Sequence, residues 1–341
     1  MDAKITKKRI ARLLSYDWLK IVGLCVVAIL VWSLVFTMTA TRIRPSQQFT
    51  VFNHHKNITL DNGFYNSYDN AYKNGTFSYE VIERNYNDLA SSPDYAHTLM
   101  EARFATDEGD VYLLPNIADT NSAVTNEETG ETEYTRTYLS SLLGSYGRYM
   151  FDIDKYFTGL ETYLGKFYTD WQDETTLNKK AVEKEFRARA KANKDKRFKK
   201  EAEIQAGVKK DIVRIEKYRD ALEKLYGYLD EGVVSLVKAG YTSGDGSYTL
   251  PEKNYGLNLC PNVATMGGLS KEFAYYGTRD KIDENGTPVL DSEGKPVTEQ
   301  YITAENMTLV FLNMSGVENG FQYESLLYAV YLIDSYYKPL A

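Results

Sequence analysis

The chain has 341 residues, of which 43% are hydrophobic and 26% are charged, so it is long enough to bury a substantial core. Its charge is divided: residues 1–44 carry a net +6, which leaves −13 on residues 45–341. An acidic body of this kind argues against a nucleic-acid partner. The two cysteines, Cys25 and Cys260, lie far apart and Cys25 is inside an apolar run, so no intrachain disulfide is expected. The 29 tyrosines are an unusually high number, and they fit either a tyrosine-rich core or a binding surface.

The apolar run covers residues 21–40 and contains no charged side chain. A helix of this length is about 30 Å long, which matches the hydrocarbon layer of a bilayer. Basic residues are concentrated before the run, so the positive-inside rule predicts a cytoplasmic tail (1–20), a transmembrane signal anchor (21–40) and a linker (41–48), with the remainder outside the cell. A cleaved signal peptide is the open alternative, whereas a lipoprotein is disfavoured because Leu24 precedes Cys25.

Strand and helix signals alternate in residues 49–137. Strands are predicted at 49–55, 77–84 and 109–115, with at most a short helix in 60–75 and a longer one in 91–106. Residues 118–136 are polar and are expected to form a loop. This order predicts the first part of a parallel α/β lobe.

Residues 138–240 carry apolar side chains at helical spacing and predict a helical hairpin. One stripe runs from Tyr156 to Trp171 and the other from Ile204 to Leu236, with Ile212 in the middle as a core residue. Between them, residues 179–200 contain eleven basic and three acidic side chains. This stretch is expected to be a solvated helical segment, although it also fits a surface that lies on anionic lipids or wall polymers.

Residues 241–341 return to strand patterns. A strand is predicted at 254–259, a projecting β-hairpin at 283–298, a buried strand at 305–316 and a final helix at 321–337. The predicted fold class is therefore α/β, with a large helical hairpin inserted into the lobe and one transmembrane helix before it.

The strand segments 49–55, 77–84 and 109–115, with Asp110 near the start of the third, resemble the first lobe of bacterial extracellular solute-binding proteins, the receptors of ABC importers. Segments 254–259 and 305–316 resemble the strands that return to that lobe. The chain also resembles membrane-anchored relatives in Gram-positive bacteria, which share a YDWLK-like sequence before the span. The resemblance implies a degenerate solute-binding lobe at the membrane, because the helical hairpin stands where that family has a second α/β lobe.

Ligands of parallel α/β sheets collect at the carboxyl ends of the strands. The residues expected there, as candidates for binding a small polar ligand such as a sugar or a peptide, are Asn53, His54, Asn85, Tyr86 and Asn116. Tyr86 is expected to stack on a sugar ring while Asn85 and Asn116 bond its hydroxyls. The alternative is that all five are ordinary turn residues.

No catalytic, metal or cofactor site is predicted. The chain has three histidines, His54, His55 and His97, and it contains no HExxH, CxxC or GxSxG sequence. Two functions remain open: a membrane-anchored extracytoplasmic binding protein, tied to an ABC transporter, or a structural subunit of a cell-envelope complex that contacts other membrane proteins. A concave cleft lined by Tyr and Asn favours the first, and a flat apolar patch on the hairpin favours the second.

Overall fold

The computed structural model describes residues 7–39, 43–54, 62–90, 93–119, 122–125, 132–261, 276–281, 288–302, 306–314 and 320–337. The chain divides into two compact units, Met1–Ile43 and Arg44–Ala341. The boundary falls within the predicted linker, which extends from residue 41 to residue 48.

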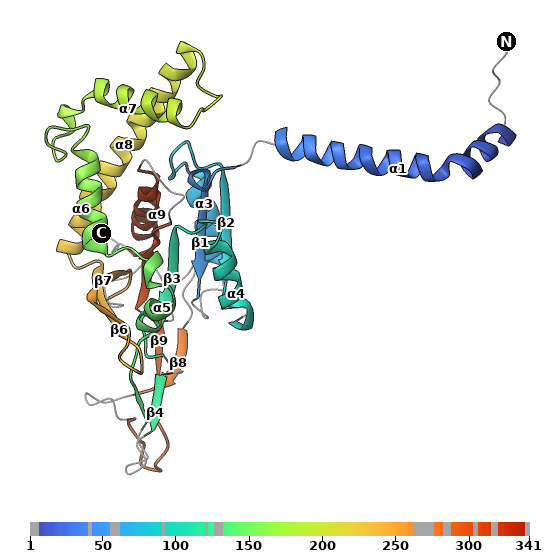
Figure 1. The fold of residues 1–341 in the computed structure, drawn as a ribbon. Helices are drawn as coiled ribbons and strands as arrows, with labels where there is room; N and C mark the ends of the chain where they lie inside the picture. Colours follow the sequence, from blue (N-terminus) through green and yellow to red (C-terminus); the bar gives the residue numbers. More distant parts are fainter. Residues whose placement is uncertain are drawn as a thin grey trace. The chain divides into compact units, whose positions relative to one another are not determined.

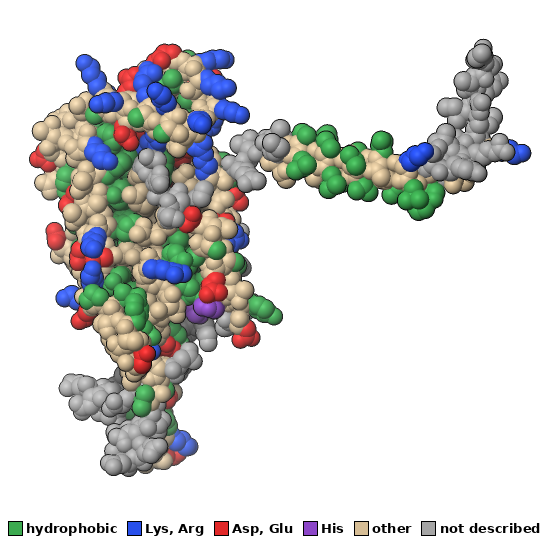
Figure 2. Space-filling model, viewed as in Figure 1, with side chains coloured by type: hydrophobic (Ala, Val, Ile, Leu, Met, Phe, Trp, Pro, Cys, Tyr) green, Lys and Arg blue, Asp and Glu red, His purple; other side chains and the backbone are tan. Residues whose placement is uncertain are grey.

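The first unit contains one long helix, α1 (Lys7–Thr39). Its segment Trp18–Thr37 has a mean hydropathy of 2.6 and is long and apolar enough to cross a membrane. Apolar side chains lie exposed along this segment, among them Leu24 at 74% and Phe36 at 65% (Figure 2). A helix that is apolar on all sides and makes no core with its own unit has the character of a membrane span.

The second unit is built on a six-stranded mixed sheet with the order β2-β1-β3-β10-β7-β6 (Figure 1). Its strands, in chain order, are β1 (Gln48–Asn53), β2 (Glu83–Asp88), β3 (Val111–Pro115), β6 (Ser235–Thr242), β7 (Thr249–Asn258) and β10 (Met307–Phe311). Strand β1 pairs in parallel with β2 and β3, whereas β10, β7 and β6 join by antiparallel pairing. The predicted α/β class is confirmed, but the sheet is parallel only in its first three strands.

Helices cover both faces of this sheet (Figure 1). They are α3 (Asn62–Lys73), α4 (Pro93–Phe104), α5 (Tyr138–Tyr146), α6 (Ile153–Leu164), α7 (Lys179–Ala192), α8 (Glu201–Asp230) and α9 (Glu324–Leu332), with short turns η1 (Pro45–Gln47), η3 (Gly147–Tyr149), η4 (Glu174–Thr176), η6 (Phe321–Tyr323) and the π-helical η7 (Ile333–Tyr337). Alternate strand residues separate the two faces: Val111 and Leu113 join the core with α3, α6, α8 and α9, whereas Tyr112 and Leu114 join the core with α4 and α5.

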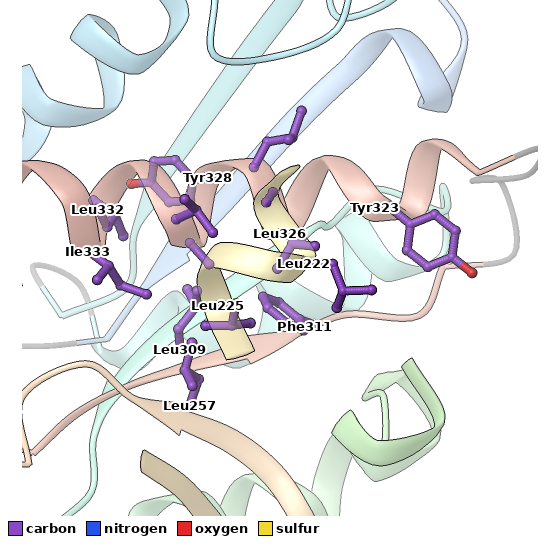
Figure 3. Packing of buried hydrophobic residues seen from close by; sticks show 14 of the residues in the cluster. Leu222, Leu225, Leu257, Leu309, Phe311, Tyr323, Leu326, Tyr328, Leu332 and Ile333 are labelled. Carbon is purple, nitrogen blue, oxygen red and sulfur yellow. The ribbon is translucent and has the colours of Figure 1, made fainter. Parts of the chain in front are cut away.

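The larger core lies where α8 and α9 meet the centre of the sheet (Figure 3). Leu222 and Leu225 of α8 pack beside Leu326 of α9, over Leu309 of β10, and all four are fully buried. As far as Leu229, the apolar stripe predicted for residues 204–236 therefore forms the core face of one helix. Ile212 itself is only half-buried and packs at the edge of this core.

Two short ribbons lie outside the main sheet. One pairs β4 (Ala123–Thr125) with β5 (Thr132–Tyr134), within the segment that was predicted to be a loop. The other pairs β8 (Tyr276–Asp280) with β9 (Thr298–Ile302). The hairpin predicted at 283–298 falls partly outside the described residues, and its described part continues this ribbon through a bridge between Leu290 and Pro296.

Two predicted boundaries are wrong, and one segment is more buried than predicted. The strand predicted at 77–84 lies at Glu83–Asp88 instead, because Phe77 and Val81 enter the core from a turn closed by a Val81 N–H to Ser78 carbonyl bond of 3.2 Å. The long helix ends at Asp230, where Gly232 adopts a left-handed φ of +70°, so Leu236 belongs to strand β6. The basic segment 179–200 is not fully solvated, since Val182, Phe186 and Arg189 of α7 are buried.

Candidate functional site

A cavity of about 370 Å³ lies at the carboxyl ends of β1 and β3. Helix α3, which leads from β1 to β2, and helix α4, which leads from β2 to β3, belong to cores on opposite faces of the sheet. The chain therefore leaves β1 toward one face and reaches β3 from the other. A crevice at such a switch point is the usual ligand site of open α/β sheets. We call this hollow the β1–β3 cavity.

Most of the polar side chains that line the β1–β3 cavity carry a hydroxyl or an imidazole group. They come from the end of β1, from β3 and from α4 and α5, namely His54, His97, Tyr112, Tyr138, Ser141, Ser145 and Tyr146, with the carboxylate of Asp119 after β3. Ala96, Met100, Leu114 and Leu142 supply apolar lining. A hollow of this size, with an apolar floor and a few convergent polar groups, is typical of small-molecule sites.

His54 and Tyr112 are joined across the two central parallel strands. The backbone N–H of His54 donates to the carbonyl of Leu113 at 2.7 Å, which places His54 at the end of β3. Its Nδ1 is 3.0 Å from the hydroxyl of Tyr112. Burial raises the pKa of Tyr112 well above its ordinary value, so this hydroxyl keeps its proton and remains a hydrogen-bonding group at neutral pH.

Tyr146 of α5 and His97 of α4 join the two helices above the sheet. The Tyr146 hydroxyl hydrogen-bonds to Nδ1 of His97, and the Nε2 of the same ring is 3.2 Å from Glu101 Oε1. An ionised carboxylate only accepts, so Nε2 of His97 carries a proton; in the neutral ring Nδ1 then accepts from Tyr146. Burial raises the pKa of Tyr146 to about 12, with the nearby Glu101 charge adding to the effect. The phenol is therefore a proton donor throughout the physiological range.

The third polar pair consists of Ser141 and Asp119. The Ser141 hydroxyl donates to Asp119 Oδ2 at 2.5 Å. In a serine nucleophile relay an imidazole stands between the hydroxyl and the carboxylate. Here the hydroxyl bonds the carboxylate directly, so the pair presents a hydroxyl and a carboxylate for hydrogen bonding.

Among the residues that the structure describes, no three His, Cys, Asp or Glu side chains gather as a metal site. His55 lies outside the described residues.

Of the five predicted binding residues, His54 lines the β1–β3 cavity. Asn53 is fully buried on the opposite face of the sheet, and its side-chain amide donates to the hydroxyl of Tyr86 at 2.8 Å. Tyr86 lies within β2, half-buried against the core of α3 and α9. Burial raises the pKa of Tyr86 well above its ordinary value. Asn53 and Tyr86 are thus brought together, but away from this cavity.

The other two predicted residues stand apart from both. Asn85 is inside β2 because that strand begins six residues later than predicted, and its carbonyl accepts from the Tyr68 hydroxyl at 3.1 Å. Asn116 follows β3 directly, and its backbone N–H donates to the carbonyl of Asn306 at 2.8 Å. Neither residue lines the β1–β3 cavity.

Helix α5 contributes side chains to the β1–β3 cavity, and these cannot be predicted from the positions of the strand ends. Tyr138, Ser141, Leu142 and Ser145 of α5 all line the β1–β3 cavity, at spacings of three and four residues. Such a spacing places side chains on one helix face. Polar residues at this period, in a helix that also carries the buried Leu139 and Leu143, are the sequence signal for this face.

Comparison with protein-family models, with curated proteins and with solved structures finds no match to this chain. The likeness to solute-binding proteins is therefore carried by the sequence segments alone and stays a prediction.

Proposed function

We propose that this chain is a single-pass membrane protein whose domain lies outside the cytoplasm and binds a small polar ligand, such as a sugar or a peptide, in the β1–β3 cavity. The cavity's position at the switch point between β1 and β3 is the observation that carries this proposal. The hydroxyls of Tyr112, Tyr146 and Ser141 supply donors and acceptors of the kind that bind a sugar or a peptide.

The orientation rests on charge. Residues 1–20 carry six basic and two acidic residues, and the apolar helix follows them. Basic residues are retained on the cytoplasmic side during insertion, so the second unit is exported. An ABC transporter is the membrane partner that the resemblance implies.

The helical region supports a binding role over a structural one. In the described part of α6, α7 and α8, Val213 is the only large apolar side chain that is more than half exposed. A subunit that assembles through these helices needs a broader apolar surface. The described part of α6, α7 and α8 offers no such surface.

The described cavity lining comes from the sheet strands and the segments that follow them, α4 and α5, while α6, α8 and α9 share the core on the other face. A receptor that closes two lobes buries most of its ligand, whereas a one-sided hollow leaves more of it in water. We expect dissociation constants above about 1 µM for this reason.

A thermal-shift screen of sugars, short peptides and cell-wall fragments against the purified protein tests the proposal. A hit is then measured with two variants, Tyr112→Phe and Tyr86→Ala. Binding in the β1–β3 cavity predicts weakening by Tyr112→Phe and no change with Tyr86→Ala. The reverse result places the ligand beside Tyr86 and Asn53 instead. Absence of any stabilising ligand, together with a co-purifying membrane protein, contradicts the binding role.

A further inference from the structure

A second and larger cavity, of about 580 Å³, lies between α8 and the turn formed by residues 75–81. It shares no lining residue with the β1–β3 cavity. One wall is the face of α8 that carries Lys209, Lys210, Val213, Arg214 and Lys217. Steps of three and four residues bring these side chains to one side of the helix. We call this hollow the α8 cavity.

The α8 cavity is lined by four cationic side chains and by no acidic one. Arg214 is fully buried and is neutralised by Asp211, whose Oδ1 accepts from Arg214 Nε at 2.8 Å. Lys217 donates to the carbonyls of Gly75 at 2.5 Å and Phe77 at 3.3 Å, which fixes the turn opposite α8. The carbonyls that Lys217 contacts carry no formal charge, so Lys217 keeps its positive charge at the cavity wall.

Lys209 and Lys210 are exposed at this wall. In the part of the chain that the structure describes, neither makes an ion pair, and Lys210 Nζ lies 5.5 Å from the centre of the Tyr79 ring. Residues 45–341 carry a net −13. A hollow whose charged lining residues are all cationic therefore has the opposite charge to the domain as a whole. Focused charge of one sign attracts ligands of the other.

Apart from Gly75 and Ser78, the rest of the lining is apolar or aromatic. Phe77 and Val81 form the inner surface, and Val213 is 51% exposed beside the two lysines. A free inorganic anion gains nothing from contact with an apolar surface, whereas an organic anion is stabilised when its apolar part is buried there. Figure 2 shows further Lys and Arg side chains at the end of the domain that carries α7.

We propose that the α8 cavity binds a phosphate ester that carries an apolar or aromatic group. The ammonium groups of Lys209 and Lys210 hold the phosphate as point charges, while Phe77, Val81 and Val213 receive the apolar part. The same chemistry belongs to soluble organic phosphates and to phospholipid head regions, so the experiment separates these two sources.

The test uses the full chain in nanodiscs of phosphatidylcholine, with phenyl phosphate as the probe in calorimetric titrations. Phenyl phosphate is expected to bind more tightly than inorganic phosphate, and benzyl alcohol, which lacks the charge, is expected not to bind. The double variant Lys209→Ala/Lys210→Ala weakens phenyl phosphate binding by about tenfold or more. The matched control Lys155→Ala/Lys238→Ala removes the same charge from exposed positions outside the cavity and changes the affinity less than about twofold.

Val213→Asp provides the second variant, because an exposed side chain tolerates the change while its carboxylate repels the phosphate. Equal affinity for phenyl and inorganic phosphate, equal loss in both double variants, or retention of binding in Val213→Asp overturns the proposal. Replacing part of the lipid by phosphatidylglycerol then distinguishes the sources: competition with phenyl phosphate identifies a lipid ligand, and unchanged binding identifies a soluble one. Tyr112→Phe, which alters the β1–β3 cavity, is expected to leave phenyl phosphate binding unchanged. A failure of the function proposed for the β1–β3 cavity is therefore distinguishable from a failure of this proposal.

Discussion

The carboxylate of Asp110 accepts a hydrogen bond of 2.7 Å from the backbone N–H of Thr50, which ties the start of β3 to β1. Asp110 is buried, and burial raises its pKa to about 8, against the effect of the Thr50 hydrogen bond and with a contribution from the Glu324 charge. A carboxyl group at the centre of the sheet is therefore protonated in the folded protein at neutral pH.

This shift predicts a pH-dependent stability. The folded-state pKa lies above the unfolded value of about 4, so the folded state binds more protons and the free energy of unfolding falls as pH rises from about 4 to about 8. Asp110→Asn keeps an acceptor for Thr50 but cannot ionise. Denaturant unfolding is expected to show a smaller decline for this variant across that range.

Asp245 provides the control for Asp110. Hydrogen bonds from Ser243 and Ser247 lower its pKa to about 2 in an exposed turn. Asp245→Asn therefore leaves the change between pH 4 and pH 8 as in the wild type. A wild-type-like decline in Asp110→Asn contradicts the assignment of the proton to Asp110.

The buried ion cluster on α8 predicts a large loss of stability on removal of its anion. Asp211 accepts from Arg214 Nε at 2.8 Å and from Arg189 Nη2 at 3.0 Å. Burial favours a raised pKa for Asp211, but the two guanidinium groups hold the pKa below its ordinary value. Asp211→Ala leaves two buried cations uncompensated, and we expect a loss of about 3–5 kcal/mol in the free energy of unfolding.

Glu183 is the matched control for Asp211. It pairs with Arg187 on the surface of α7, where both side chains are more than one-third exposed. Glu183→Ala is expected to cost less than about 1 kcal/mol. The free energy of unfolding of both variants is measured by denaturant titration. Similar losses contradict the prediction that the buried ion cluster contributes more stability than the exposed pair.

Leu222 tests the core between α8 and α9. It is fully buried beside Leu225, so Leu222→Ala is expected to cost about 2–5 kcal/mol by leaving a cavity. Val213→Ala, on the exposed face of the same helix, is expected to stay within about 0.5 kcal/mol of the wild type. If the unfolding midpoints of Leu222→Ala and Val213→Ala shift equally, the Leu222 face of α8 does not pack against the core.

Membrane orientation is tested by protease added to intact cells or spheroplasts. The charge of residues 1–20 predicts that the second unit is digested and that a small membrane fragment survives. Protection of the second unit contradicts the orientation. A mature N-terminus near residue 40 favours the cleaved signal peptide that the sequence left open.

The α/β class and the long core helix were predictable because their apolar periods are strong. Strand β2 was misplaced for a physical reason: it is an edge strand, with a polar sequence that includes Arg84 and Asn85, whereas the apolar residues Phe77 and Val81 before it enter the core from a turn. Local pattern alone cannot distinguish a buried turn from a buried strand.

The candidate site was only partly predictable for a related reason. His54 was found because it follows a strand that was correctly placed. Tyr112 points from the middle of β3 toward the α5 face, and Tyr146 comes from a helix. Their meeting depends on how α4 and α5 pack on the sheet, which a single sequence does not reveal.

Filling the β1–β3 cavity with a bulky side chain shows whether a ligand binds there. Ser145 lines the cavity and is exposed, so Ser145→Trp occupies the space without removing an observed hydrogen bond. Calorimetric titration of a ligand from the thermal-shift screen is expected to show binding to the wild type and to the control Lys238→Trp, and none to Ser145→Trp. Undiminished binding to Ser145→Trp contradicts the account.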